Sequence, residues 1–236
     1  MRIKINLTEN LTNIPINNQE LVNSYIHRCL GDNNSYHDNI SNYSVSNIRG
    51  GKLNNNKEAL SIKKPFIIVS SNDISFINSL LIGIGNNNNF NDKYNILVTG
   101  IEFINEMLHD GFNLFKTLTP ILLKEKINGC KKRTITVNDD DFIPKLKESI
   151  IRKIKMLSPD SDLTNFDIKL ADNSIKKTKM ITIKNVTSVG SLCDLIIVSN
   201  KKTAELIYNF GIGQSTGSGF GTVYEYKNHN IYHENV

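Results

Sequence analysis

The order of its predicted strands and helices constrains the fold of this chain more than any single motif does. In the first half, hydrophobic periodicity predicts a strand, a helix, two strands, a second helix and a further strand. The strands are expected over 1–8, 43–48, 66–70 and 95–107, and the helices over 17–30 and 73–84. This order is that of the split βαβ, or ferredoxin-like, unit.

The second half of the chain repeats this order less regularly. Two extended pieces flank Pro120, and Asp139–Asp141 is expected to begin a helix that ends at Leu157. Further strands are expected over 134–137, 166–170, 180–186, 192–199 and 221–226, and a short helix over 201–208. We therefore predict an α+β fold with two tandem ferredoxin-like (RRM-like) domains, 1–110 and 111–236.

Composition excludes several classes of protein. Of the 236 residues 39% are hydrophobic, and no apolar run approaches the roughly 20 residues that a membrane helix needs. The first ten residues lack the apolar core of a secretory signal. Cys29, Cys130 and Cys193 have neither the number nor the spacing of a disulfide framework or a zinc site. We expect a cytoplasmic protein with no metal, no other cofactor and no membrane partner.

Charge is compatible with a polyanionic partner without requiring one. The chain has 28 Lys and Arg against 23 Asp and Glu, a net charge of +5. On the helix expected to end at Leu157, five basic residues are predicted on the faces away from the apolar stripe. They are Lys145, Lys147, Arg152, Lys153 and Lys155.

The most informative motif is the glycine-rich segment 211–221, with the sequence GIGQSTGSGFG. Glycines allow backbone N–H groups to approach a phosphate closely and to point in one direction. The segment follows a helix and precedes a strand, the reverse of a dinucleotide-binding loop, and it lacks the Gly-Lys-Ser/Thr ending of a P-loop. Its residues fit either an anion-binding loop or a flexible connection.

The form of this segment, with Gly-Phe-Gly at 219–221 before a final strand, resembles the C-terminal glycine-rich loop of the Cas6 family. Three other stretches are similar to that family and occur in the same order. They are the opening strand 1–7, Tyr36-His37-Asp38 with the later Gly50–Gly51, and residues 115–121. The resemblance covers most of the chain. It implies a CRISPR-associated endoribonuclease of the ferredoxin-like RAMP superfamily, which processes precursor CRISPR RNA in antiviral defence.

The resemblance also implies a reaction. In this family the 2′-hydroxyl attacks the scissile phosphate without a metal ion, leaving a 2′,3′-cyclic phosphate (or 3′-phosphate) and a 5′-hydroxyl. Such a reaction needs a base, an acid and positive charge, and histidine suits both proton roles. His37 is the first catalytic candidate and His27 the second, with acid and base unassigned. Tyr43 and Lys52 are further candidates, although Tyr43 alternates with Val45 as a core residue would.

RNA is expected to bind along the glycine-rich loop and the basic faces. The residues predicted for this role are Gly211, Gly213, Gln214, Ser215, Thr216, Gly217, Ser218, Gly219, Phe220, Gly221, Lys131, Lys132, Arg133, Arg152 and Lys155. The expected partner is CRISPR repeat RNA or pre-crRNA, and other Cas effector subunits or a second copy of the chain stay open. The alternatives are a non-catalytic crRNA-binding subunit of a CRISPR effector complex, and a binder of a small phosphorylated ligand.

Overall fold

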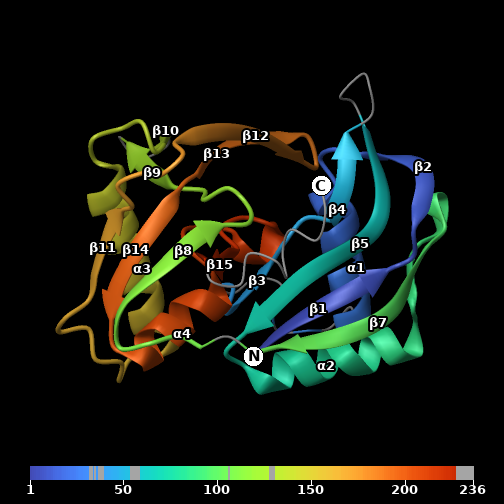
Figure 1. The fold of residues 1–236 in the computed structure, drawn as a ribbon, viewed down its shortest axis with the longest axis horizontal. Coiled ribbons are helices and arrows are strands. Elements are labelled where there is room, and N and C mark those ends of the chain that lie inside the picture. The colour runs from blue at the N-terminus through green and yellow to red at the C-terminus, as the bar shows by residue number, and fades with distance from the viewer. Residues whose placement is uncertain are drawn as a thin grey trace.

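The computed structural model describes residues 1–31, 34, 36, 40–53, 59–105, 107–127 and 131–226, and Figure 1 shows their arrangement. Each half of the chain forms a curled antiparallel sheet with two helices, and the two sheets lie side by side. Two two-stranded ribbons complete the strands described. The predicted α+β fold with two tandem ferredoxin-like units is confirmed.

The first sheet has the strand order β2-β5-β1-β7-β6, and both β3 and β4 also pair with β5. Its strands are β1 (Arg2–Leu7), β2 (Asn10–Pro15), β3 (Tyr43–Val45), β4 (Arg49–Leu53), β5 (Ala59–Ser71), β6 (Asn89–Asn91) and β7 (Ile96–Ile104). Helices α1 (Gln19–Leu30) and α2 (Ile74–Asn86) and the single turn η1 (Asp92–Tyr94) complete this half. The path β7-β1-β5-β3 has the ferredoxin-like order.

β4 was not predicted, since the strand expected over 43–48 ends at Val45 as β3. Three further strands differ from the prediction. β5 is far longer than the expected 66–70, because β2, β3 and β4 pair with different parts of it. β2 and β6 lie in segments expected to be loops. All three misses fall on Asn-rich or Lys-rich sequence, where main-chain pairing rather than side-chain periodicity defines the strand.

The second sheet has the order β11-β14-β8-β15, which is the ferredoxin-like order again. Its strands are β8 (Gly111–Thr117), β11 (Asp167–Leu170), β14 (Asp194–Ser199) and β15 (Val223–Glu225), with helices α3 (Phe142–Leu157) and α4 (Lys201–Phe210). One ribbon pairs β9 (Lys124–Ile127) with β10 (Lys131–Thr134), and the other pairs β12 (Lys177–Ile183) with β13 (Val186–Leu192). The strand expected over 180–186 contains a turn, since Lys184 and Asn185 have positive φ.

Each half has its own buried core, and a third cluster joins the halves. Ile3 and Ile5 of β1 pack in the first core, while Phe115 and Leu146 pack in the second. Phe66, Ile68, Leu118 and Tyr224 form the joining cluster with residues from both halves. None of the helices in the described part of the chain is long and apolar enough to cross a membrane.

Arg2 of β1 lies at the junction of the two halves. It is 1% exposed, although strand alternation placed it on a polar face. Its guanidinium donates to the carbonyls of Val223 (2.6 Å) and Tyr208 (2.8 Å) and lies 3.4 Å from the centroid of the Tyr208 ring. The second half therefore covers a face of the first sheet that the sequence alone assigned to solvent.

Candidate functional site

The glycine-rich loop, residues 211–221, fills the junction between the two halves. It contains the single turn η2 (Thr216–Ser218), and most of its residues are buried, with Ser215 exposed and Gln214 and Ser218 half-buried. Toward the first half, the Ser218 carbonyl accepts a hydrogen bond from the Asn23 side chain of α1 at 3.4 Å. The loop therefore contacts the helix that also carries His27.

Two glycines show why the loop needs this residue type. Gly221 has a φ of +62°, and a Cβ there would lie 1.8 Å from the carbonyl oxygen of Ile212. A Cβ on Gly217 would lie 2.6 Å from Cζ of Tyr43. Close packing against protein, rather than mobility, therefore explains these glycines.

Several backbone amides of the loop are bound to protein carbonyls and so are not open donors for a phosphate. The N–H groups of Gly211, Gly219 and Gly221 donate to the carbonyls of Ile207, Thr216 and Pro120. Those of Ile212 and Gln214 are also bound to protein carbonyls. The side chains of Gln214, Ser215 and Ser218 are not buried and can meet a ligand from solvent.

Lys153 of α3 binds the loop and the residue that precedes it. It is 8% exposed, and its Nζ donates to the carbonyl of Phe210 and to Oγ1 of Thr216, both at 2.8 Å. Thr216 Oγ1 in turn donates to the carbonyl of Tyr43 at 2.8 Å. Burial lowers the pKa of Lys153 to about 7. This corrects the prediction that Lys153 lies on a solvated face of its helix.

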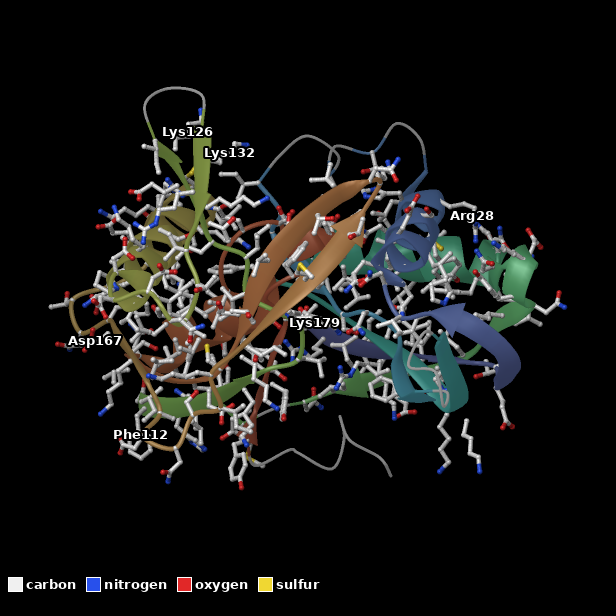
Figure 2. The ribbon with its side chains drawn as sticks, turned by 90° about the horizontal axis from the view of Figure 1, so that it is seen from above. Arg28, Phe112, Lys126, Lys132, Asp167 and Lys179 are labelled. Atoms are coloured by element: carbon white, nitrogen blue, oxygen red, sulfur yellow. The ribbon has the colours of Figure 1, made fainter. Side chains whose placement is uncertain are left out.

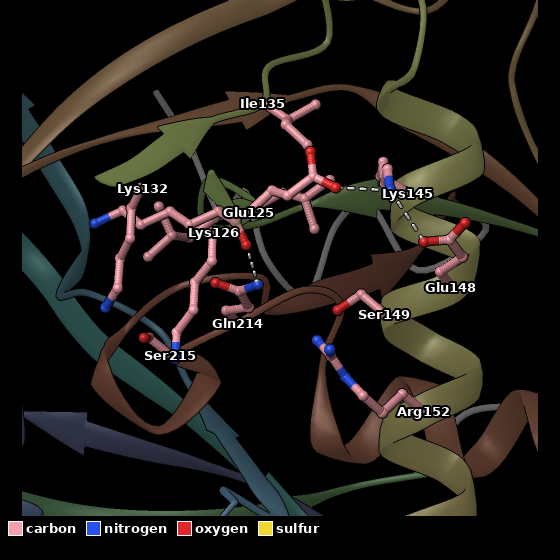
Figure 3. A pocket seen from close by; sticks show the side chains of 13 residues that line it. Glu125, Lys126, Lys132, Ile135, Lys145, Glu148, Ser149, Arg152, Gln214 and Ser215 are labelled. Atoms are coloured by element: carbon pink, nitrogen blue, oxygen red, sulfur yellow. Dashed lines mark hydrogen bonds and ion pairs between the residues drawn. The ribbon is translucent and has the colours of Figure 1, made fainter. Parts of the chain in front are cut away.

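Two adjoining cavities form a groove along the loop, and Ser149, Arg152, Gln214 and Ser215 line both. We call it the loop–α3 groove. The larger cavity, of about 610 Å³, extends to the β9–β10 ribbon (Figure 3). The smaller, of about 300 Å³, extends to Ile40 and Ser41 just before β3. The complete lining adds Leu122, Leu123, Lys124, Glu125, Lys126, Lys132, Ile135, Lys145 and Glu148 in the larger cavity, and Lys153, Met156, Gly213, Thr216 and Ser218 in the smaller one.

The predicted basic residues divide into accessible cations and ion-paired ones. Lys132 and Arg152 are exposed and line the groove. Figure 2 shows Lys132 beside Lys126 toward the free end of the β9–β10 ribbon, and in Figure 3 Arg152 extends from the α3 side. Arg133 instead binds Asp139 at 3.2 Å and Asp141 at 3.0 Å.

Two further predicted basic residues contribute less. Lys155 is exposed on α3 and lines neither cavity. Lys131 begins β10, and its side chain lies outside the described residues. Of the five basic residues predicted to bind RNA, the structure therefore places Lys132 and Arg152 in the groove.

The candidate catalytic residues have very different surroundings. His27 is half-buried on α1, one turn after Asn23. Tyr43 is 2% exposed and stacks on Phe76 with ring centroids 4.3 Å apart, and burial raises its pKa to about 12. These contacts are those of a packing residue that supports the loop, and a catalytic role for Tyr43 stays a prediction.

His37 lies outside the described residues. Tyr36 before it and Asn42 after it both make hydrogen bonds to the same side chain. The Tyr36 hydroxyl and the Asn42 side-chain amide each donate to Oδ2 of Asp73 at 3.3 Å. Asp73 also caps α2. Lys52 pairs with Ser61 in the β4–β5 ladder, and its side chain is likewise outside the described residues.

The structure contains no group of three or more His, Cys, Asp or Glu that could hold a metal ion, as far as its described residues reach. Asp139–Asp141, which precede α3 as predicted, include two carboxylates that bind Arg133. Asp141 occupies the N-cap position without a side-chain capping bond.

Sequence reasoning missed Lys153 as a residue of the site, although a signal for it was present. Leu146 and Ile150 define the buried stripe of α3, and position 153 follows them at the spacing i+7 and i+3. A lysine on an apolar stripe of a helix is unusual enough to predict a buried ammonium with a specific partner.

The structure is therefore an α+β protein of two tandem ferredoxin-like units that meet at a glycine-rich loop. The family model described as "CRISPR associated protein Cas6, C-terminal" matches residues 105–224. The chain therefore belongs to the Cas6 family, the CRISPR-associated proteins that process crRNA.

Solved structures agree with this fold. A Cas6-related protein from Pyrococcus furiosus is 22% identical, with 97% of this chain and 99% of that chain covered and a TM-score of 0.82. A structure described as "An RAMP protein binding different RNA substrates" is 22% identical over 95% and 99%, with a TM-score of 0.80. A Cas6 product complex is 11% identical over 95% and 98%, with a TM-score of 0.63. No curated protein sequence matches this chain.

Proposed function

We propose that this protein is a metal-independent endoribonuclease that cleaves precursor CRISPR RNA within its repeats. The 2′-hydroxyl upstream of the scissile phosphate attacks the phosphorus, and the bond to the 5′-oxygen breaks. The products are a 2′,3′-cyclic phosphate (or 3′-phosphate) and a 5′-hydroxyl. Membership of the Cas6 family supports this reaction class.

The observation that carries the proposal is the contact between α1 and the glycine-rich loop. Asn23 binds the Ser218 carbonyl, and His27 follows Asn23 by one helical turn. The helix with one candidate histidine therefore lies against the loop whose exposed side chains border the loop–α3 groove. RNA lying in that groove would pass beside the start of β3, close in sequence to His37.

The chemistry assigns one proton transfer to each histidine. A neutral imidazole removes the proton of the attacking 2′-hydroxyl, and an imidazolium protonates the departing 5′-oxygen. Since an unperturbed imidazole titrates near pH ~6.5, both forms are present near neutral pH. Lys52 is proposed to stabilise the negative charge that develops on the phosphorane, because a fixed cation at that position lowers the energy of the transition state.

Cleavage of a labelled repeat RNA from the same genome, in the presence of EDTA, tests the proposal. The wild type is compared with His27→Ala, His37→Ala and a substrate with a 2′-deoxy sugar at the cut site. We expect loss of roughly 10²- to 10⁴-fold in the single-turnover rate for either histidine, the usual contribution of a general acid or base. The 2′-deoxy substrate should bind and remain uncut.

His109→Ala is the matched control, since His109 is exposed and lines neither cavity of the groove. It should cleave as the wild type does. Tight RNA binding without cleavage by the wild type would contradict the enzyme and support the non-catalytic crRNA-binding subunit. Full activity of His37→Ala would move the proton transfers to His27 and another group.

A further inference from the structure

The smaller cavity of the loop–α3 groove is lined by cations and hydroxyl groups. Arg152 and Lys153 contribute positive charge, and Ser215 and Ser218 contribute hydroxyls from the loop. Among the described residues that line it, none is Asp or Glu. The lining of the larger cavity differs, because it includes two carboxylates, Glu125 and Glu148, which both pair with Lys145.

Lys153 makes the electrostatics of this cavity unusual. Its two hydrogen-bond acceptors, the Phe210 carbonyl and the Thr216 hydroxyl, are uncharged, and an ammonium has three N–H bonds. Its Nζ also lies 4.7 Å from the centroid of the Phe210 ring. Burial removes water from the ammonium and lowers the pKa of Lys153 to about 7. An anion in the cavity would supply the missing negative charge and an acceptor.

We propose that this cavity binds one phosphate group, with Lys153 and Arg152 as its cations and the hydroxyls of Ser215 and Ser218 as neutral donors. A tetrahedral anion with several acceptor oxygens suits such a donor set better than a single carboxylate does. Under the proposed function the phosphate belongs to the repeat RNA, so the identity of the ligand rests on that function. The phosphate chemistry of the cavity does not.

Occupation of this cavity has a consequence for the glycine-rich loop. Lys153 is bonded to Thr216, and Thr216 to the Tyr43 carbonyl at the start of β3. A phosphate beside Lys153 therefore acts on the chain of hydrogen bonds that joins α3, the loop and the first half. Binding and the position of the loop are coupled through this one side chain.

Phosphate binding is linked to proton uptake by Lys153, because a nearby anion favours the ammonium over the amine. The elements that carry or contact Lys153 hold further charged or titratable groups. They are Tyr43 on β3, Lys145, Lys147, Glu148, Arg152 and Lys155 on α3, and Lys201, Lys202, Glu205 and Tyr208 on α4. Residues 211–221 contain none. Side chains of these types ordinarily titrate well away from pH 7, whereas burial lowers the pKa of Lys153 to about 7, so Lys153 is the member of this set that responds near neutral pH.

The first arm of the test measures the lysine directly in the wild type. The ¹³Cε resonance of Lys153, assigned by its loss in Lys153→Met, is titrated with pH in potassium phosphate and in potassium chloride of equal ionic strength. We expect a higher midpoint in phosphate. An unchanged midpoint would overturn the cavity as a phosphate site. This measurement does not depend on RNA or on cleavage.

The second arm asks whether the phosphate comes from RNA. Binding of 2′-deoxy-substituted, uncleavable repeat RNA is measured for the wild type, Lys153→Met and Lys153→Arg. At pH 6.5 we expect Lys153→Met to bind about tenfold more weakly, as for a lost charge-assisted contact. Its slope of log Kd against log salt should be lower by roughly 0.7–0.9. At pH 9 the difference from wild type should nearly vanish, whereas Lys153→Arg should stay pH-independent over this range.

Lys202→Met is the control, since Lys202 is exposed on α4 and lines neither cavity. If Lys153→Met binds RNA as Lys202→Met does, while the resonance shifts with phosphate, RNA is overturned as the source and free phosphate is the ligand. If the wild type fails to bind or cut RNA and the resonance still shifts, the proposed function fails and the phosphate site stands. Lys153→Arg keeps the second arm decisive if Lys153→Met folds poorly.

Discussion

The two halves of α3 border the same groove but balance their basic residues differently. In the first half, Lys145 pairs with Glu125 and Glu148, and Lys147 pairs with Asp167. In the second half, Arg152 and Lys153 have no carboxylate partner among the described residues. Both halves are rich in lysine and arginine in the sequence. Only the second half leaves positive charge available to a ligand.

The two halves of α3 also differ in how their basic residues are packed. The paired charges of the first half lie at the surface, where ion pairs contribute little to stability. The second half packs, through Lys153, against a loop whose glycines are closed in by protein on both sides. Sequence composition shows where the charged residues are. Ion pairing and burial in the fold determine which of them are available to bind a ligand. Four predictions test this contrast.

The largest effect is expected for Gly221→Ala in the loop. The new Cβ would overlap the Ile212 carbonyl, and the positive φ would add backbone strain. We expect a loss of about 3 kcal/mol or more in the free energy of unfolding, measured in urea. Gly85→Ala, in the open at the end of α2, is the control and should be neutral or stabilising by up to about 1 kcal/mol. Equal stability of both variants would show that the loop is not tightly packed.

A smaller loss is expected for Thr216→Val, which keeps the shape of the side chain and removes its hydroxyl. Lys153 loses an acceptor and the Tyr43 carbonyl loses a donor, both in buried surroundings. The expected cost is about 1–3 kcal/mol in urea unfolding. Thr182→Val serves for comparison, because the hydrogen bond between Thr182 and Thr187 is exposed and its loss should change stability by less than about 0.5 kcal/mol.

The third prediction compares two arginines in RNA binding and rests on the proposed function. Arg152→Gln should lower the slope of log Kd against log salt by about one, since one phosphate contact is lost. Arg133→Gln should leave the slope near that of the wild type, because Asp139 and Asp141 already neutralise Arg133. Fluorescence anisotropy over a salt series checks both. Similar losses for the two variants would remove the contrast between the ion-paired Arg133 of β10 and Arg152 of α3, which has no carboxylate partner in the described part of the chain.

The smallest effect is expected for Asp139→Asn. The Thr136 N–H and hydroxyl and the Arg133 guanidinium donate to Asp139 and hold its pKa below the usual range. A carboxylate with a lowered folded-state pKa adds stability above its unfolded value of about 3.9 and loses it as pH falls through the folded value. The variant should therefore be slightly less stable than wild type at pH 7. This difference should shrink in acid unfolding curves as pH falls below about 3.9 and disappear once it is below the folded-state pKa.

Much of the fold could be predicted because the periodicity of apolar side chains shows which strands and helices form and which of their faces are buried. The alternation of Ile3, Ile5 and Leu7 and the stripe of α1 both point to buried faces, and the structure buries them. β2 could not be predicted, since its residues NLTNIP show no alternation and β5 supplies its pairing. Where a strand depends on a partner far along the chain, local sequence contains little of the information.

Part of the lining of the groove could be predicted, since Gln214, Ser215, Lys132 and Arg152 were expected to bind RNA and line its larger cavity. Sequence could not show that the amides of Gly211, Gly219 and Gly221 bind protein carbonyls, because their partners belong to other turns and segments. Tyr43 is packed in the core, as its alternation with Val45 had allowed, and its catalytic role stays a prediction. Lys153, expected on a solvated face of its helix, is buried and lines the groove. Arg133 was predicted to bind RNA, and the structure shows that it forms ion pairs with Asp139 and Asp141.

The buried Arg2 has a consequence for the order in which the chain can fold. β1 is synthesised well before the residues whose carbonyls accept from Arg2, since Tyr208 and Val223 lie 206 and 221 positions further along the chain. Until those residues are synthesised, the guanidinium stays in water and one face of the first sheet stays open. The junction between the two halves is therefore completed only after β15 has been synthesised.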